Sequence, residues 1–184
     1  MTPTPTRPRG ARPPMVLRVR RRPGSVHIGV LEGAGLSLPC ALGRSGLTRF
    51  KREGDGATPV GRFELLHGFR RADRALPPVA PIPLRPIRVD DGWCDDVGDG
   101  RYNRLVRLPL AASHETLRRD DALYDVVIVL DWNVRRRVIG RGSAIFFHLA
   151  RPDFAPTAGC VALRPADMRR LLARLSGRCV MEIG

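Results

Sequence analysis

The sequence predicts one mainly β domain, a twisted sandwich or partly closed barrel with one or two short helices. The 184 residues include 17 Pro and 19 Gly, which indicate many turns and extended segments rather than a helical bundle. Apolar residues make up 43% of the chain, enough to bury a core in a single domain of this length. Because aromatic residues make up only 5%, the core is expected to consist mainly of Val, Leu, Ile and Ala.

The beginning of the chain is strongly basic. Residues 1–24 hold seven Arg and six Pro but no Asp or Glu, so half of the net charge of +14 lies there. This composition predicts a disordered basic Pro/Arg-rich arm over 1–15, followed by a single domain over 16–184. The arm is either a solubilising tail of an Arg-rich protein, in which Lys51 is the only Lys, or a handle for a polyanion such as nucleic acid or an anionic cell-wall polymer.

In the first half of the chain, alternating apolar residues predict strands over 16–20 and 26–31, with a Pro-Gly hairpin signal between them. Residues 43–62 are dense in Gly and charge, and we expect a loop there. Residues 76–86 carry five Pro among hydrophobic residues, which restricts them to an extended passage at a sheet edge.

In the second half, residues 90–104 are polar and are expected to form a loop. The continuous β-branched run at 126–130 predicts a strand buried on both faces. A second apolar run follows at 144–148, and residues 178–183 are expected to return as a closing strand.

The clearest helix signal covers residues 165–176. Pro165 suits the first helical position, Asp167 suits the positive end of the helix dipole, and Gly177 suits the exit. Four apolar residues recur at helical spacing and predict one buried stripe: Met168, Leu171, Leu172 and Leu175.

No segment approaches 18 consecutive apolar residues, so no membrane span is expected. Nor does an apolar stretch follow the basic N-terminus as in a secretory signal. The four cysteines show no C-x-x-C spacing and lie near no second His, so no metal site is expected. The pattern leaves open a disulfide among Cys40, Cys94 and Cys179.

Cys160 and His148 are the candidate catalytic residues. A hydrophobic strand ends on His148, and Cys160 follows a Thr-x-Gly turn formed by Thr157 and Gly159. A nucleophilic thiol needs a base, a pocket that lowers its pKa, and donors that hold an oxyanion. His148 suits the base, and the backbone N–H groups around Gly159 and Cys160 suit the oxyanion. Spacing alone equally allows a buried cysteine and a core histidine.

The segment 146–163 resembles the catalytic motif of the YkuD-type L,D-transpeptidases, in which a His ends one strand and a Ser/Thr-x-Gly-Cys turn follows. Residues 56–63 resemble the Thr-Pro-x-Gly-x-Phe segment of that family. Three further segments resemble a divergent bacterial branch of it: 92–96, 102–104 and 124–128. The resemblance covers roughly residues 40–184 and implies a YkuD-like fold.

The resemblance implies a peptidoglycan L,D-transpeptidase with Cys160 as nucleophile and His148 as general base and acid. The thiolate would take the acyl group of a tetrapeptide donor stem, release D-Ala, and pass the acyl group to an acceptor amine in a 3→3 or 1→3 cross-link. Water in place of the amine would give L,D-carboxypeptidase activity. Peptidoglycan stem peptides are the expected partners, with no cofactor, no nucleic acid and a monomeric enzyme. The expected location is the periplasm or cell envelope, although no signal peptide is recognisable.

The motif departs from the family pattern in its loop and at Ala158 and Ala162. Only eight residues separate the His from the Thr, and family members often carry His at the first of these alanines and Arg or Asn at the second. We therefore expect other side chains to contact the substrate, with Arg151 and Arg164 as candidates.

Four more residues are candidates for the cavity wall: Trp93, Tyr102, Asp131 and Asn133. Loop packing explains the two aromatic residues equally well, and turn chemistry explains Asp131 and Asn133. The neighbouring Asp95 and Asp96 could suggest a glycosidase-type pair, but nothing else in the sequence supports one.

Two other function classes stay open on the residues alone. The net charge would suit a basic nucleic-acid-binding module, although the chain has no helix-turn-helix, zinc-finger or RRM-like signature and few aromatic residues for base stacking. A cysteine hydrolase or amidotransferase on an unrelated fold would also use Cys160. Labelling by a carbapenem would favour the transpeptidase over both.

Overall fold

The computed structural model describes residues 13–74 and 81–184. The predicted arm over 1–15 lies outside the described residues except for its last three, and β1 begins at Met15. The first part of the Pro-rich passage, 76–80, also lies outside them.

The described residues form fourteen strands and one helix. In chain order these are β1 (Met15–Arg21), β2 (Ile28–Gly33), β3 (Leu36–Ala41), β4 (Leu47–Thr48), β5 (Thr58–Pro59), β6 (Gly61–Arg70), β7 (Leu84–Pro86), β8 (Asp91–Cys94), β9 (Arg104–Arg107), β10 (His114–Thr116), β11 (Val126–Leu130), β12 (Phe146–Leu149), β13 (Val161–Leu163), α1 (Pro165–Leu172) and β14 (Cys179–Ile183). The predicted mainly β class is confirmed. The two-residue strands β4 and β5 interrupt the predicted 43–62 loop.

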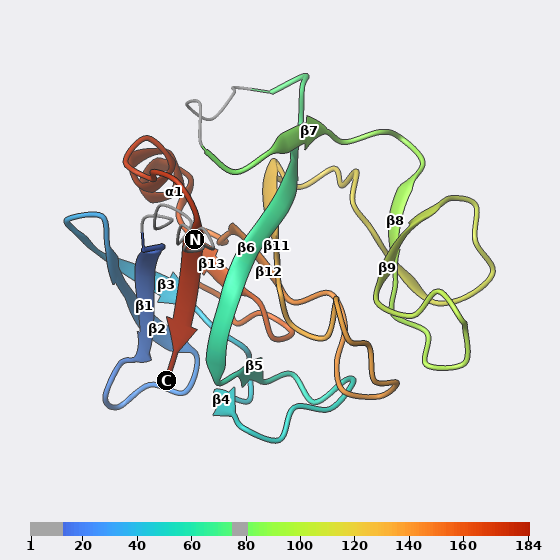
Figure 1. Cartoon of the computed structure of the whole chain (residues 1–184), viewed down its shortest axis with the longest axis horizontal. Coiled ribbons are helices and arrows are strands. Elements are labelled where there is room, and N and C mark those ends of the chain that lie inside the picture. Colours follow the sequence, from blue (N-terminus) through green and yellow to red (C-terminus); the bar gives the residue numbers. More distant parts are fainter. Residues whose placement is uncertain (1–12, 75–80) are drawn as a thin grey trace, which may run out of the picture.

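Eight strands form a closed, barrel-like ring, the second of the two architectures, sandwich or partly closed barrel, that the sequence predicts (Figure 1). Their order is β11-β12-β13-β3-β2-β1-β14-β6, and β6 pairs again with β11 to close the ring. The ring is mixed, because β1 pairs with β14 and β12 pairs with β13 in parallel, whereas the other pairs are antiparallel.

Closure depends on the ten-residue strand β6. Its first four residues, 61–64, pair with β14, and residues 65–70 pair with β11 across a register shift between Ile128 and Leu130. A bulge of this kind bends and twists a strand, which helps a sheet to close on itself. β7 pairs with residues 68–70 of β6 at the edge of the sheet, so the end of the Pro-rich passage is extended and edge-like as predicted.

The barrel interior and α1 share one hydrophobic core. The predicted stripe of Met168, Leu171, Leu172 and Leu175 is buried in that core. The helix ends at Leu172 rather than at 176. Beyond it, the N–H groups of Arg174 and Leu175 donate to carbonyls three residues back, which tightens the last turn. Gly177 then turns the chain toward β14 with a φ of 60°.

A separate three-stranded sheet, β10-β8-β9, lies beside the barrel (Figure 1). The sequence predicts a polar loop over 90–104, and this prediction is wrong for Asp91–Cys94, which form a fully buried strand. Asp91 is buried as a carboxylate because Arg85 and Arg107 pair with its two oxygens at 2.8 and 2.7 Å. Trp93 fills a second hydrophobic cluster beneath the site described below.

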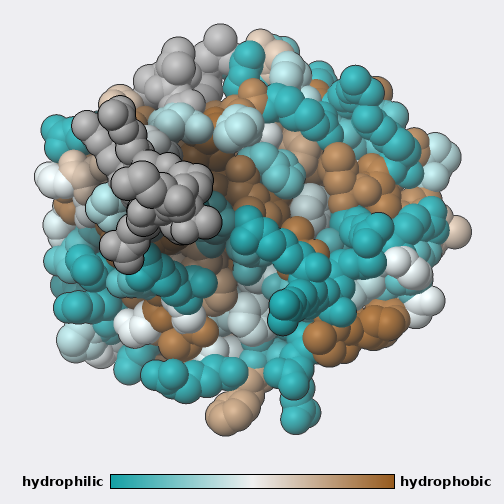
Figure 2. All heavy atoms as spheres, viewed as in Figure 1, coloured by the Kyte–Doolittle hydropathy of each residue, from teal (hydrophilic) through white to brown (hydrophobic). Residues whose placement is uncertain are grey.

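The surface reflects the composition. On the face drawn in Figure 2, hydrophilic side chains cover much of the area, with hydrophobic areas between them. No helix among the described residues is both long enough and apolar enough to cross a bilayer. All four cysteines lie in the described part of the chain and are free and buried, so no pair forms the disulfide that the sequence leaves open.

Candidate active site

The pairing of β12 with β13 brings His148 and Cys160 to the same face of the barrel. Phe147 lies opposite Val161 in parallel register, and both point into the barrel core. Because side chains alternate along a strand, His148 and its register partner Ala162 point outward. Cys160, two residues before Ala162, lies on that outer face, diagonal to His148.

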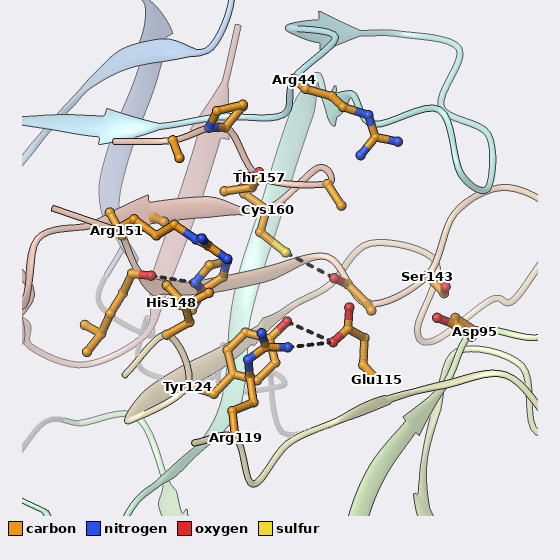
Figure 3. Close-up of a pocket in the computed structure, with 18 of the residues that line it drawn as sticks. Arg44, Asp95, Glu115, Arg119, Tyr124, Ser143, His148, Arg151, Thr157 and Cys160 are labelled. Atoms are coloured by element: carbon orange, nitrogen blue, oxygen red, sulfur yellow. Dashed lines mark hydrogen bonds and ion pairs between the residues drawn. The ribbon is translucent and has the colours of Figure 1, made fainter. Parts of the chain in front are cut away.

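Both residues line a cavity of about 380 Å³. Its floor and walls come from the turn before β13, the 44–54 loop, the small sheet and the end of β12 (Figure 3). Its polar lining residues include Arg44, Lys51, Glu53, Asp95, Glu115, Arg119, Tyr124, Ser143, Arg151 and Thr157.

The Cys160 thiol is held by backbone groups of the residues before β12. Its S–H donates to the Ala144 carbonyl at 3.2 Å, and its sulfur accepts from the Phe146 N–H at 3.3 Å. Burial raises the pKa of this thiol to about 12, and the Phe146 hydrogen bond offsets only part of that effect. The requirements of thiol catalysis predict a pocket that lowers the thiol pKa, but burial in this cavity raises it, so the resting thiol is protonated.

His148 is neutral for the same reason. Burial lowers its pKa to about 4, although a hydrogen bond to the Leu149 carbonyl works in the opposite direction. That bond joins Nδ1 to the carbonyl oxygen at 2.8 Å; since a carbonyl only accepts, the proton is assigned to Nδ1 and Nε2 is the basic nitrogen. The Tyr124 ring packs edge-on to the imidazole with 5.2 Å between centroids. The resting pair is a neutral thiol and a neutral base.

Thr157 holds the turn that presents Cys160. Its hydroxyl donates to the Cys160 carbonyl at 2.7 Å and accepts from the Gly159 N–H at 3.1 Å. Because the Gly159 N–H is committed to Thr157, the Cys160 N–H is the better candidate for an oxyanion donor. These two contacts give Thr157 a structural role in the turn.

Gly159 is required by the backbone rather than by the substrate. Its φ of 140° is one that other residues rarely adopt, and a Cβ there would lie 2.8 Å from the Ala57 carbonyl oxygen. The structure places the 44–60 loop against this glycine, which ties that loop to the nucleophile turn.

Comparison with known proteins identifies the domain. Residues 30–183 match the family model of the YkuD L,D-transpeptidase catalytic domain. The chain belongs to the YkuD family. No curated protein matches it in sequence.

Solved structures similar to this YkuD domain are L,D-transpeptidases of bacteria. One from Mycobacterium smegmatis has 13% identity and a TM-score of 0.41, with 92% of this chain and 58% of that chain covered. L,D-transpeptidase 1 of Mycobacterium tuberculosis has 11% identity and a TM-score of 0.40, with 92% and 61% covered. One from Stackebrandtia nassauensis has 10% identity and a TM-score of 0.38, with 96% and 58% covered. The chain thus spans about three-fifths of their length.

Of the two arginines predicted to contact substrate, the YkuD domain places only Arg151 at the cavity. It is exposed at the cavity mouth, on the loop that follows His148 (Figure 3). Arg164, just before α1, is not among the residues that line the cavity. Its guanidinium instead stacks on the Phe154 ring, with Cζ 4.5 Å from the ring centroid.

The other four predicted wall residues also lie outside the described lining. Trp93 is buried beneath the site, edge-on to Phe146 at 5.2 Å, and its indole N–H donates to Asn103. Tyr102 is buried and donates to Glu53, which does line the cavity. Both aromatic residues therefore pack against the residues that form the cavity wall and do not line the cavity themselves.

Asp131 and Asn133 stabilise the loop that follows β11. Asp131 pairs with Arg135 at 3.0 Å. Asn133 has a φ of 53°, and its side chain bonds to Val138 and Gly142. Turn chemistry, the alternative that the sequence left open, accounts for both residues.

For several residues that line the cavity, nothing in the sequence indicates that they lie there. Lys51 is only 3% exposed, with its ammonium held by Asp55 and the Arg52 carbonyl. Glu115 lies on the three-residue strand β10. Tyr124 falls in a segment that resembles the family, yet nothing in its spacing identifies it as a partner of His148. Among the described residues, no three His, Cys, Asp or Glu side chains are grouped so that they could hold a metal ion.

The protonated thiol leads to a prediction about reactivity. Since the pKa of Cys160 is about 12, the thiolate fraction and hence the iodoacetamide alkylation rate should rise roughly tenfold per pH unit between about pH 7 and 10. The measurement is peptide-level mass spectrometry of the Cys160 peptide after timed labelling without substrate. A rate that levels off near neutral pH would show that the resting enzyme already holds a thiolate.

Proposed function

We propose that this YkuD-family domain is a peptidoglycan L,D-transpeptidase in which Cys160 is the nucleophile and His148 the general base. The observation that carries the proposal is the pair itself, a protonated thiol and a neutral imidazole on one face of β12 and β13 in a polar cavity. A neutral imidazole can take a proton, as nucleophilic thiol catalysis requires. The family match over residues 30–183 supports the reaction class.

In the first half-reaction, the Cys160 sulfur attacks the carbonyl carbon of the third residue of a tetrapeptide donor stem. The S–H proton passes to His148 Nε2 as the C–S bond forms, because burial disfavours a free thiolate beforehand. The Cys160 N–H is the donor proposed for the oxyanion. Collapse of the tetrahedral intermediate breaks the amide bond, and His148 returns the proton to the departing D-Ala amine.

In the second half-reaction, an acceptor amine attacks the thioester, a C–N bond forms and the C–S bond breaks. His148 passes a proton of the amine to the departing sulfur. The third-residue side-chain amine as acceptor gives a 3→3 cross-link, and a first-residue amine gives a 1→3 cross-link. Water in place of the amine gives L,D-carboxypeptidase activity, and we propose the cell envelope as the site of action.

The basic side of the cavity suits the donor. Stem peptides carry free carboxylates, and a guanidinium can bind a carboxylate with two hydrogen bonds. Arg44 and Arg151 both line the cavity and lie on the same side of it as the Thr157 turn (Figure 3). The nucleic-acid alternative depends on net charge and the 1–15 arm, and no feature of the site favours it.

Removal of either catalytic group should abolish cross-linking. Cys160→Ser should reduce it by at least about 10³-fold, because a hydroxyl is a far weaker nucleophile. The hydroxyl can keep the contacts to Ala144 and Phe146, so the melting temperature should move only slightly. His148→Gln should reduce it about 10²- to 10⁴-fold.

The measurement is chromatographic detection of cross-linked muropeptides formed from purified tetrapeptide substrates. Cys179→Ser is the matched control, because Cys179 is a buried cysteine that does not line the cavity. Activity retained in Cys160→Ser, or lost equally in Cys179→Ser, would contradict the assignment.

Substitution of the two arginines that the sequence predicts to contact substrate should have different effects on kcat/KM. Arg151→Ala should lower kcat/KM for the donor stem roughly ten- to a hundredfold at physiological salt, the effect of one lost charge-assisted hydrogen bond. Arg164→Ala removes the same charge from outside the cavity lining and should change kcat/KM by less than about twofold. Equal, salt-sensitive losses in steady-state assays of both variants would mean that the arginines act only as a diffuse field.

A further inference from the structure

Charged residues of both signs line the cavity around Cys160. Arg44 and Arg151 come from the loops next to the nucleophile turn, whereas Asp95 directly follows β8 and Glu115 lies on β10 of the small sheet. Arg119 also lines the cavity, next to Glu115. Figure 3 draws Arg44 and Arg151 on the side of the Thr157 turn and the two carboxylates across Cys160 from them, with Arg119 beside Glu115. We call Arg44 and Arg151 the basic wall of the cavity and Asp95 and Glu115 its acidic wall.

The strand register brings the two carboxylates together. Trp93 of β8 lies opposite Glu115 of β10, and Asp95 follows Trp93 by two residues. Asp95 lies one residue beyond β8, where its N–H still donates to the Ser113 carbonyl at 3.2 Å, so the pairing extends to it. Side chains two residues apart share a face, which makes Asp95 and Glu115 diagonal neighbours. Burial raises the pKa of Glu115, and the Asp95 charge adds to this effect, whereas the Arg119 charge works in the opposite direction.

Neither carboxylate is well satisfied within the protein. Glu115 has only long contacts, 3.5 Å to the Tyr124 hydroxyl and 3.7 Å to Arg119. Arg119 is engaged elsewhere, because its guanidinium donates two hydrogen bonds of 2.9 and 2.8 Å to Asp121. Among the described residues, Oδ1 of Asp95 is buried without a hydrogen-bond partner. The Glu115 side chain is 35% exposed and so accessible from the cavity, and the buried Asp95 oxygen needs a donor. This pair favours a ligand that supplies N–H groups.

A primary ammonium group has the charge and the donors that Asp95 and Glu115 lack in the protein. It carries a positive charge and three donors, and it cannot be satisfied on the arginine side. The proposed reaction brings such a group to the cavity, because an acceptor amine with a pKa near that of lysine, about 10.4, is almost fully protonated at neutral pH. An ammonium is no nucleophile until it loses a proton.

We propose that Glu115, with Asp95 beside it, forms the acceptor subsite: it binds the ammonium of the acceptor stem and takes its first proton. This inference rests on the transpeptidase function proposed above. Tyr124 is the positioning residue, since its hydroxyl contacts Glu115 and its ring packs on His148.

Each of the two protons that the acceptor ammonium loses has a defined acceptor. The Glu115 carboxylate takes one proton from R–NH₃⁺ and becomes a carboxylic acid. The resulting amine attacks the thioester carbon, the C–N bond forms and the C–S bond breaks. The second amine proton passes through His148 to the Cys160 sulfur, which returns as a thiol. The raised pKa of Glu115 brings it closer to that of the ammonium and assists the first transfer.

The test measures the partition of one acyl-enzyme between two nucleophiles. The full-length protein is acylated with a tetrapeptide stem and then offered either a stem with a primary side-chain amine or hydroxylamine, which is neutral near pH 7. Glu115→Gln should slow transfer to the amine stem roughly ten- to a hundredfold. Acylation and transfer to hydroxylamine should change by less than about twofold, because neither involves an ammonium.

Asp90→Asn is the matched control, because Asp90 lies next to the same sheet, pairs with Arg107 and does not line the cavity. It should leave all three rates unchanged. Equal losses toward both nucleophiles in Glu115→Gln, or no loss toward the amine stem, would overturn the acceptor subsite while the transpeptidase function stands. A wild-type protein that forms no acyl-enzyme would overturn both.

Discussion

The parallel pairing of β12 with β13 sets the geometry on which the site depends. Phe147 and Val161 fill the barrel interior, and the same register turns His148 and Cys160 outward. A slip of one residue in either strand would exchange the two faces and put the histidine or the cysteine into the core. The barrel closure through β6 holds these strands in place, because β11 pairs with both β6 and β12.

That placement determines the protonation of the pair. The two groups lie on the barrel exterior yet are buried by the loops and the small sheet, so each remains neutral. In our account, the thiol stays neutral until a substrate carbonyl is in position. The two charged walls then have complementary tasks in our account: the arginines hold a peptide rich in carboxylates, and the carboxylates accept the cationic partner.

The sequence was most informative where the residues of the candidate site are close together along the chain. Cys160, its Thr-x-Gly turn and His148 lie within a short segment, and the stripe of α1 follows from its spacing alone. The small sheet was missed because Asp91 looks like a loop residue until Arg85 and Arg107 are known to neutralise it. Glu115 and Arg44 reach the cavity through tertiary folding, and no local pattern marks such residues. Trp93 and Asn133 proved to be supports, since residue type indicates neither which way a side chain points nor what it contacts.

The central claim is that Cys160 becomes acylated by a stem peptide. Intact-protein mass spectrometry after incubation with a purified tetrapeptide stem tests it most directly. The account predicts an added mass equal to the stem without its terminal D-Ala, located on the Cys160 peptide and released by hydroxylamine as a thioester. Turnover of the stem with no adduct on the Cys160 peptide, or an adduct on another residue, would contradict it.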